Sequence, residues 1–223
     1  DNLTFKIKQV YDIKYLRKIG HMPEEILNID KNEKSLPILS FEQIDWEASF
    51  DTVILGHMKE IEKYTKKDYI HEIADKCLEN SKSLISLGDF ERSNVYAEKF
   101  KEKGLLLYIP MVTKADVPPV FAGKLRSIGV PVIGIFGTSS RQGKFTLQVA
   151  LRNYFIGQGY KVGQLGTEPT SLLFGFDEVY PFGYDSTVKV SGRDEIAVIN
   201  NMMGRIEDKN PDLIIVGSQS QTI

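Results

Sequence analysis

The chain has 223 residues, of which 42% are hydrophobic and 26% are charged, and its formal net charge is -2. These proportions are typical of a globular protein that is long enough for one large domain or two small ones. Basic and acidic residues are interleaved, so the chain has no positive field to attract nucleic acid or an anionic membrane surface, and neither partner is predicted.

The cysteine content and the lengths of the apolar runs bear on the cellular compartment. Cys77 is the only cysteine, which excludes an intrachain disulfide and fits a reducing cytosol. It lies in an amphipathic stretch and is predicted to be a small buried side chain rather than a reactive thiol. No apolar run approaches the ~20 residues of a membrane span, and no signal segment is recognisable. The sequence therefore predicts a cytoplasmic protein.

The two ends of the chain suggest a piece of a longer product. The first residue is Asp1 rather than Met, and Ile223 comes just after an apolar strand whose loop has barely begun. A parallel sheet that stopped there would have an open edge and an unfinished site. We therefore expect further residues beyond the C-terminus.

The first half of the chain alternates between short apolar runs and helical patterns. A weak strand signal at residues 5–11 is followed by a β-α-β-α-β pattern, with strands at 52–55, 84–87 and 105–109 and helices at 67–78 and 93–103. This alternation is typical of a parallel sheet flanked by helices. Residues 110–130 then break the periodicity with prolines and glycines. The predicted domains are residues 1–116 and residues 117–223.

The second half begins a new α/β unit. An apolar strand at residues 131–136 precedes a glycine-rich loop and a helix to about Ile156, whose predicted inner face carries Leu147, Ala150, Leu151, Tyr154 and Phe155. A strand at 161–165, an irregular stretch to Val190, a helix at 194–206 and a strand at 213–216 follow. The fold class predicted for the whole chain is α/β, with two Rossmann-like units of mainly parallel sheet, the second a P-loop NTPase-like domain.

The glycine-rich loop at residues 137–146 has the features of a phosphate-binding site. Strand, loop and helix in this order bring successive backbone N–H groups together at the positive N-terminus of the helix, where they bind phosphate. Lys144 is expected to reach the β- and γ-phosphates and is the predicted catalytic residue. The predicted nucleotide-binding residues are Gly137, Thr138, Ser139, Ser140, Arg141, Gln142, Gly143, Lys144, Phe145 and Thr146.

The loop departs from the usual G-x4-G-K-[ST] pattern in two ways. Five residues rather than four separate Gly137 from Gly143, and Phe145 stands where Ser or Thr normally follows the lysine. The next hydroxyl belongs to Thr146, which is therefore the predicted Mg²⁺ ligand. A glycine-rich turn with an exposed lysine is the alternative interpretation.

The loop resembles the GT-x4-GK-x-T loop of dethiobiotin synthetase and, more closely, that of a P-loop family that includes D-glutamate N-acetyltransferase-like proteins and clostridial peptide-maturation-system proteins. The likeness covers about Val117 to the last residue. It includes the sequences DVPP at residues 116–119, GTEPT at 166–170 and IVGSQS at 215–220. In that family an acidic residue usually stands where this chain has Val216, and another where it has Ser139. The resemblance therefore implies a nucleotide site with two fewer carboxylates than usual.

Other polar residues are predicted at the carboxyl ends of strands, where ligands bind in open α/β sheets. Glu168 is the predicted substitute for the missing metal-binding carboxylate, with Asp185 as a weaker alternative. Ser218 and Gln219 are predicted to bind substrate. An ordinary polar loop remains open for all four. His57 and Asp89 follow strands of the first unit, so they are weaker functional candidates.

Three functions stay open at this point. The first is an enzyme that uses ATP and Mg²⁺ to activate a carboxyl group or to transfer a phosphoryl group on a small amino-acid or peptide substrate. The second, implied by the resemblance, is an N-acyltransferase whose loop holds the phosphates of acyl-CoA. The third is a nucleotide-sensing accessory protein of peptide maturation, without turnover. A homo-oligomer is compatible with each.

Overall fold

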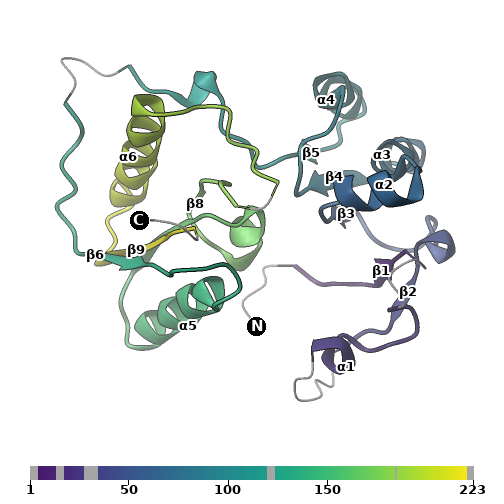
Figure 1. Ribbon diagram of the computed structural model, residues 1–223, viewed down its shortest axis with the longest axis horizontal. Coiled ribbons are helices and arrows are strands. Elements are labelled where there is room, and N and C mark those ends of the chain that lie inside the picture. Colours follow the sequence, from purple (N-terminus) through teal and green to yellow (C-terminus); the bar gives the residue numbers. More distant parts are fainter. Residues whose placement is uncertain (1–4, 14–17, 28–34, 120–123, 184, 220–223) are drawn as a thin grey trace.

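The computed structural model describes residues 5–13, 18–27, 35–119, 124–183 and 185–219. Its elements form two lobes, one with the strands up to β5 and one with the strands from β6 onward (Figure 1). All paired strands in the described ranges are parallel. The predicted fold class, α/β with parallel sheets in two Rossmann-like units, is confirmed.

The chain begins with a small two-stranded sheet. Strand β1 (Val10–Asp12) pairs with β2 (Ile38–Ser40), with the short helix α1 (Pro23–Leu27) between them and the 3₁₀ turn η2 (Phe41–Gln43) directly after β2. The strand predicted at residues 5–11 was placed too early. Its partner β2 offers only three residues for pairing, so the ladder is equally short.

The second sheet has the order β3-β4-β5 and carries three helices. The elements in chain order are β3 (Thr52–Leu55), α2 (Lys59–Thr65), α3 (Tyr69–Glu79), β4 (Ser83–Ser86), α4 (Ser93–Glu102) and β5 (Leu107–Tyr108). Helix α2 was not predicted, because its sequence KEIEKYT has little apolar periodicity and Met58 before it provides no side-chain cap.

The core of this sheet is formed by α3, α4 and the strands. Leu84 of β4 and Phe100 of α4 are fully buried, and so is Cys77 of α3. Burial raises the pKa of the Cys77 thiol to about 12. The prediction that Cys77 is a buried apolar side chain is confirmed.

The first residues of the connection to the second lobe are held by a β-bridge and by a capped 3₁₀ turn. Val112 is fully buried and forms a single parallel bridge with Val188 of the second unit. The 3₁₀ turn η3 (Lys114–Asp116) follows, and its first N–H groups are capped by the Thr113 side chain. The first part of the connection therefore packs against the second unit.

The third sheet has the order β6-β9-β7-β8, which places β6 at one edge. Its elements are β6 (Val132–Ile135), α5 (Lys144–Gly157), β7 (Val162–Gly166), η5 (Pro169–Phe174), β8 (Glu178–Val179), α6 (Arg193–Glu207) and β9 (Leu213–Gly217). The stretch predicted to be irregular contains η5 and β8. Both are too short to give a periodic pattern.

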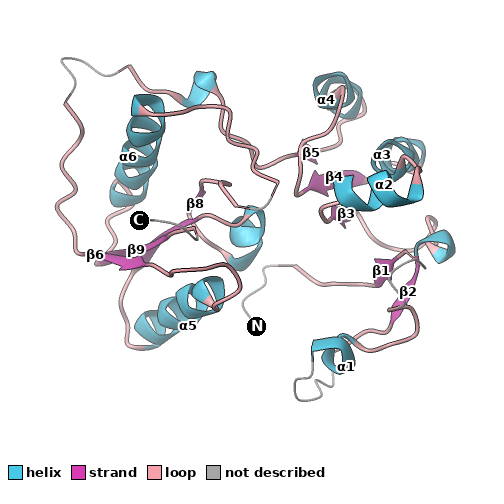
Figure 2. Ribbon diagram, in the orientation of Figure 1, coloured by secondary structure: helices cyan, strands magenta, loops and turns pink. Residues whose placement is uncertain are grey.

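Helices α5 and α6 cover opposite faces of this sheet (Figure 2). Ile214 of β9 packs in the cluster under α6, and the next residue, Ile215, packs in the cluster under α5. Both are fully buried. Successive side chains of a strand point to opposite faces, so this run of apolar residues is typical of a strand covered on both sides.

The predicted inner face of α5 was partly wrong. Leu151 and Phe155 pack on the sheet, but Leu147 and Tyr154 are 48% and 59% exposed. The inner position of the first turns belongs instead to Gln148, which is 1% exposed. Ala150, which was also predicted on the inner face, is exposed as well.

None of the helices in the described ranges is both long enough and apolar enough to cross a membrane.

Candidate nucleotide-binding site

The loop of residues 137–143 joins the carboxyl end of β6 to the first turn of α5. Residues Thr138 to Gly143 are exposed. Gly143 has φ +78° and takes the N-cap position of α5, so the helix starts at Lys144. A residue in this left-handed conformation turns the chain so that the first N–H groups of the helix point toward the loop. The strand, loop and helix that bind phosphate are thus present in the predicted order.

The side chain of Gln142 lies inside the curve of the loop. Its Oε1 accepts hydrogen bonds from the backbone N–H of Ser139 at 3.3 Å and from the Thr138 hydroxyl at 3.4 Å. An amide oxygen therefore accepts from donors that would equally serve a phosphate oxygen. These donors converge on one point, as anion binding requires.

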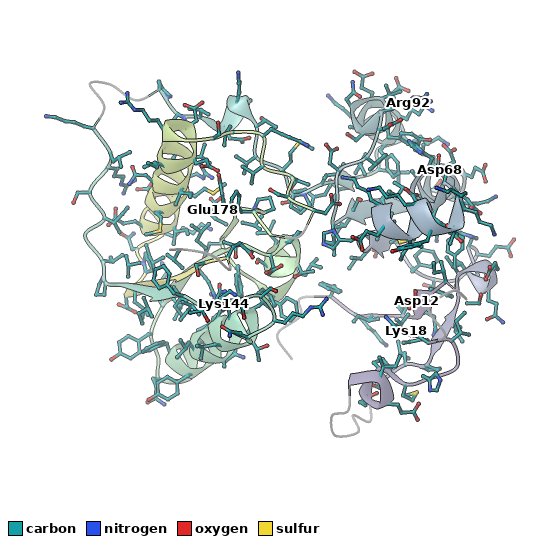
Figure 3. All side chains as sticks on the ribbon, viewed as in Figure 1. Asp12, Lys18, Asp68, Arg92, Lys144 and Glu178 are labelled. Atoms are coloured by element: carbon teal, nitrogen blue, oxygen red, sulfur yellow. The ribbon has the colours of Figure 1, made fainter. Side chains whose placement is uncertain are left out.

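Lys144 crosses the same loop. Its Nζ donates a hydrogen bond to the carbonyl oxygen of Ser139 at 2.7 Å, and its side chain passes Gly137 so closely that a Cβ there would lie 2.9 Å from Lys144 Cδ. Figure 3 shows the lysine at the start of α5. Gly137 is needed for this close passage, which brings the ammonium to the mouth of the loop.

Phe145 packs within the protein. Its ring lies 5.2 Å from that of Phe174 in an edge-on arrangement and 5.5 Å from that of Phe176 in a stacked one. Phe176 is 4% exposed. Phe145, which stands where Ser or Thr is usual, thus packs the first turn of α5 against the segment after β7. Only its backbone can take part in phosphate binding.

The neighbouring Thr146 is exposed on the first turn of α5. An exposed hydroxyl one residue past the usual position is accessible to a metal ion. Within the described residues, no group of three His, Cys, Asp or Glu side chains is arranged to hold a metal. A Mg²⁺ ion would therefore take most of its ligands from phosphate oxygens and water, as Mg²⁺ often does.

The strands bring the other predicted residues to the same edge of the sheet. Ile135 of β6 is paired with Gly217 of β9, and the N–H of Ser218 donates to the Ile135 carbonyl at 3.1 Å. Gln219 Nε2 lies 3.3 Å from Glu168 Oε1 and 3.3 Å from the Thr167 carbonyl. The ends of β6, β9 and β7 are thus adjacent, with Glu168, Ser218 and Gln219 grouped there.

Val216 stands where the resembling family has a carboxylate. It lies on β9 opposite Gly134 and packs partly against the cluster under α6. Its side chain therefore belongs to the core, whereas the Glu168 carboxylate lies beside Gln219 at this edge.

Two buried glutamines under the loop were missed by sequence reasoning. Gln148 of α5 packs against Gly217, where an added Cβ would lie 2.5 Å from Gln148 Oε1. Gln164 of β7 is fully buried and donates from Nε2 to the Gln148 carbonyl at 3.3 Å. Their Oε1 atoms have no hydrogen-bond partner in the described part of the chain. The available signal was a glutamine inside the otherwise apolar strand VGQLG.

Asp89, a weaker candidate, has a structural role. It accepts hydrogen bonds from the Phe90 N–H and from the Ser93 hydroxyl, both at 3.0 Å, at the start of α4. Its carboxylate also lies 3.4 Å from the ammonium of Lys189 in the second unit. Asp185 lies against residues of the first unit, 3.7 Å from His57.

The fold and the loop define this half of the chain as a P-loop domain. Residues 119–222 match the model of a family described as a domain of unknown function, DUF1611, P-loop domain. The chain is also similar to the crystal structure of a DUF1611 family protein from Anabaena variabilis, with a TM-score of 0.68 and 18% sequence identity. That match covers 96% of this chain and 58% of the other. No curated protein matches the sequence.

Proposed function

We propose that the loop of residues 137–146 binds the phosphates of ATP, and that the protein uses ATP to activate a carboxyl group or to transfer a phosphoryl group on a small amino-acid or peptide substrate. The observation that carries this proposal is a pair of hydrogen bonds at Ser139. The Ser139 N–H, a donor that could bind phosphate, points at Gln142 Oε1, and the Lys144 ammonium, a positive charge, donates to the Ser139 carbonyl. A phosphate needs both in one place.

The chain's own residues have distinct tasks in this proposal. Backbone N–H groups of the loop hold the phosphates, and the Lys144 ammonium neutralises charge on the group that is transferred. Thr146 and Glu168 would hold a Mg²⁺ ion, which supplies charge neutralisation when bound. Ser218 and Gln219, at the adjacent strand end, would contact the substrate.

A specific observation favours a second candidate, an N-acyltransferase that holds the phosphates of acyl-CoA. This chain has Val216 and Ser139 where the resembling family usually has carboxylates, and Phe145 where the usual motif has a hydroxyl. Acyl transfer from CoA needs no metal at the phosphates, so these losses would not impair it. The resemblance to D-glutamate N-acetyltransferase-like proteins supports the same reading. An accessory protein of peptide maturation that binds nucleotide without turnover would share these losses.

A thermal-shift panel tests the proposal. Wild type and Lys144→Ala are each melted with ATP, ADP, GTP and acetyl-CoA, with and without Mg²⁺. The proposal expects ATP with Mg²⁺ to raise the melting temperature of the wild type most and that of Lys144→Ala much less. A shift with acetyl-CoA alone, independent of Mg²⁺, would favour the acyltransferase. A shift with ATP, but no consumption of ATP in a separate assay with amino acids present, would favour the accessory protein. No shift with any of the four would contradict phosphate binding.

A further inference from the structure

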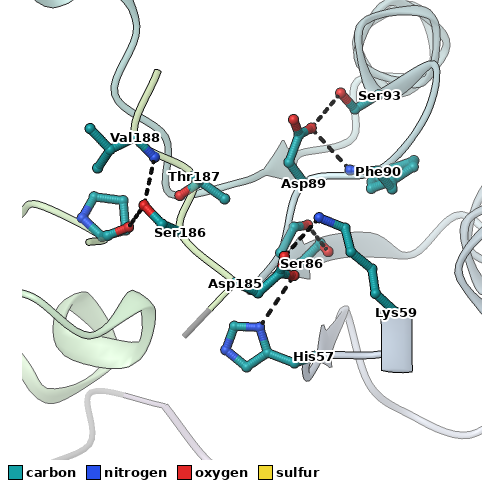
Figure 4. Close-up of polar contacts among 12 residues, drawn as sticks. His57, Lys59, Ser86, Asp89, Phe90, Ser93, Asp185, Ser186, Thr187 and Val188 are labelled. Atoms are coloured by element: carbon teal, nitrogen blue, oxygen red, sulfur yellow. Dashed lines mark hydrogen bonds and ion pairs between the residues drawn. The ribbon is translucent and has the colours of Figure 1, made fainter. Parts of the chain in front are cut away.

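A second cluster of charged side chains lies where the two units meet. His57 follows β3 in the first unit, Lys59 opens α2, and Asp185 comes from the segment between β8 and α6 of the second unit. Lys59 Nζ is 2.8 Å from Asp185 Oδ1, and His57 Nδ1 is 3.7 Å from Asp185 Oδ2 (Figure 4). One carboxylate thus joins two basic side chains across the boundary between the units.

The close approach of Asp185 depends on local backbone features. A Cβ on Gly88 would lie only 2.7 Å from Asp185 Oδ2, so glycine at that position makes room for the carboxylate. Asp185 itself has φ +54°, a left-handed conformation that is strained for a residue with a side chain. The Asp185 side chain is 19% exposed. The chain maintains a strained and largely buried carboxylate here.

A cavity of about 210 Å³ opens beside these residues, lined by His57, Lys59, Glu60, Lys63 and Asp185. A single water needs only about 10–15 Å³ on such a measure, so the cavity has room for a small organic molecule. The ammonium of Lys63 has no ion-pair partner in the described ranges, whereas that of Lys59 is already paired with Asp185. The Lys63 ammonium is therefore available to pair with a ligand in the cavity.

The charges of the lining select the kind of molecule that fits. Lys59 and Lys63 are positive, and Glu60 and Asp185 are negative. A purely anionic ligand would lie against two carboxylates and a purely cationic ligand against two ammonium groups, and both arrangements cost interaction energy. A small zwitterion, with a carboxylate toward the lysines and an ammonium toward the acids, would meet both signs favourably.

The segment that leads to Asp185 also borders the carboxyl ends of β7 and β9, and β9 pairs with β6, the strand that leads into the P-loop. A Cβ on Gly183 would lie 3.0 Å from Gln219 Nε2 and 3.4 Å from Glu168 Oε2. Consecutive Cα atoms are about 3.8 Å apart, so the Cα of Asp185 is at most about 8 Å from that of Gly183. One segment therefore borders the strand-end cluster with Gly183 and the cavity with Asp185.

We propose that this cavity between the units is the binding site for the second substrate, a small zwitterionic molecule of the amino-acid type, held by Lys59 and Lys63 on one side and by Glu60 and Asp185 on the other. The proposal rests on the proposed function, because it supplies the molecule that receives the group activated at the P-loop. It adds a location and a set of ligands to that function.

Ligand-observed NMR and calorimetry test the proposal with matched pairs of probes. The pairs are alanine with propionate, glutamate with glutarate, and phenylalanine with 3-phenylpropionate, so each pair differs in the amino group alone. We expect at least one amino acid to bind and its partner acid to bind at least tenfold more weakly. Equal binding within every pair, or no binding of any amino acid, would overturn the proposal.

Variants locate the binding. Lys63→Ala removes an ammonium that has no ion pair in the described ranges and should weaken amino-acid binding at least tenfold, whereas Lys189→Ala, which changes a lysine paired with Asp89 outside the cavity lining, should not. Unchanged binding in Lys63→Ala would overturn the proposal. In Lys144→Ala the amino acid should bind as in the wild type, so the cavity is tested even if the P-loop binds no nucleotide.

Discussion

Lys144 Nζ donates a hydrogen bond to the carbonyl oxygen of Ser139, five residues earlier in the same loop, at 2.7 Å. The loop thus supplies an acceptor for its own lysine, and the ammonium is already at the loop mouth. A phosphate that replaced this carbonyl as the acceptor would gain a charge-assisted hydrogen bond, whereas the lysine would have to move little. Two predictions concern the loop and the first turn of α5.

The first concerns Lys144→Ala. Removal of the ammonium should weaken nucleotide binding by about 1.5–3 kcal/mol, roughly ten- to a hundredfold, which is the scale of a hydrogen bond to a charged group. Calorimetric titration with ATP measures the change. The exposed Lys124, in the connection before β6, provides a matched control as Lys124→Ala. Unchanged affinity in Lys144→Ala would mean that the loop is an ordinary turn rather than a phosphate-binding site.

The second concerns Thr146→Ala. The hydroxyl is proposed to contact the metal rather than the phosphate, so its removal should weaken ATP binding only when Mg²⁺ is present. The same titrations, carried out with Mg²⁺ and with a chelator, separate the two cases. A loss of equal size in both conditions would assign Thr146 to the phosphates instead.

Phe145 provides a third prediction, on stability. Its ring packs against those of Phe174 and Phe176, so Phe145→Ala should lower the free energy of unfolding by about 2 kcal/mol, somewhat less than for a fully buried phenylalanine. Urea unfolding measures this. Phe136 is 71% exposed, and Phe136→Ala should change stability by no more than about 0.5 kcal/mol. Equal losses in the two variants would show that the ring contacts of Phe145 contribute nothing.

The sequence was informative where an element is long or covered on both faces. Strand β3 has the predicted bounds, and α4, α5, α6 and β9 differ by one or two residues, because periodicity and apolar runs directly reflect burial. The elements that were missed are α1, β2, α2, β8 and the 3₁₀ turns η2, η3 and η5. Each has at most seven residues, which is too short to give a periodic pattern.

The site was predictable only in part. The P-loop is a local motif, so its position could be read from the spacing of Gly137, Gly143 and Lys144. The contact between Asp185 and His57 joins residues that are distant in the sequence, and it depends on how the two units meet. The burial of Gln148 depends on the strand order, which places Gly217 of the inner strand β9 against α5. Neither feature leaves a pattern in the sequence.

Cys77 leads to a fourth prediction. Burial raises its pKa to about 12, so near neutral pH almost none of the thiol is present as the reactive thiolate. The folded protein should react with a thiol reagent such as DTNB far more slowly than the same protein in concentrated guanidinium chloride. The measurement is the rate of absorbance change in the two conditions. Similar rates would mean that the helix α3 opens readily.

The last prediction concerns His71 in α3. Its Nδ1 lies 2.8 Å from the Asp68 carboxylate and its Nε2 lies 3.0 Å from the Glu91 carbonyl. Both ring nitrogens therefore face acceptors, and only the protonated imidazolium can donate to both. Burial lowers the pKa of His71, but the Glu91 carbonyl and the Asp68 carboxylate together outweigh it, so the pKa is raised above 6.5.

The sign of the pH effect follows from this direction. Because the folded protein binds the proton more tightly than the unfolded chain, the contribution of His71 to stability is fully present below about pH 6.5 and is lost as the pH rises through the higher folded pKa. Urea unfolding of the wild type and of His71→Gln across this range should give curves that converge as the pH rises. A difference between wild type and His71→Gln that stayed constant from acid to alkaline pH would mean that the His71 ring stabilises α3 by packing alone.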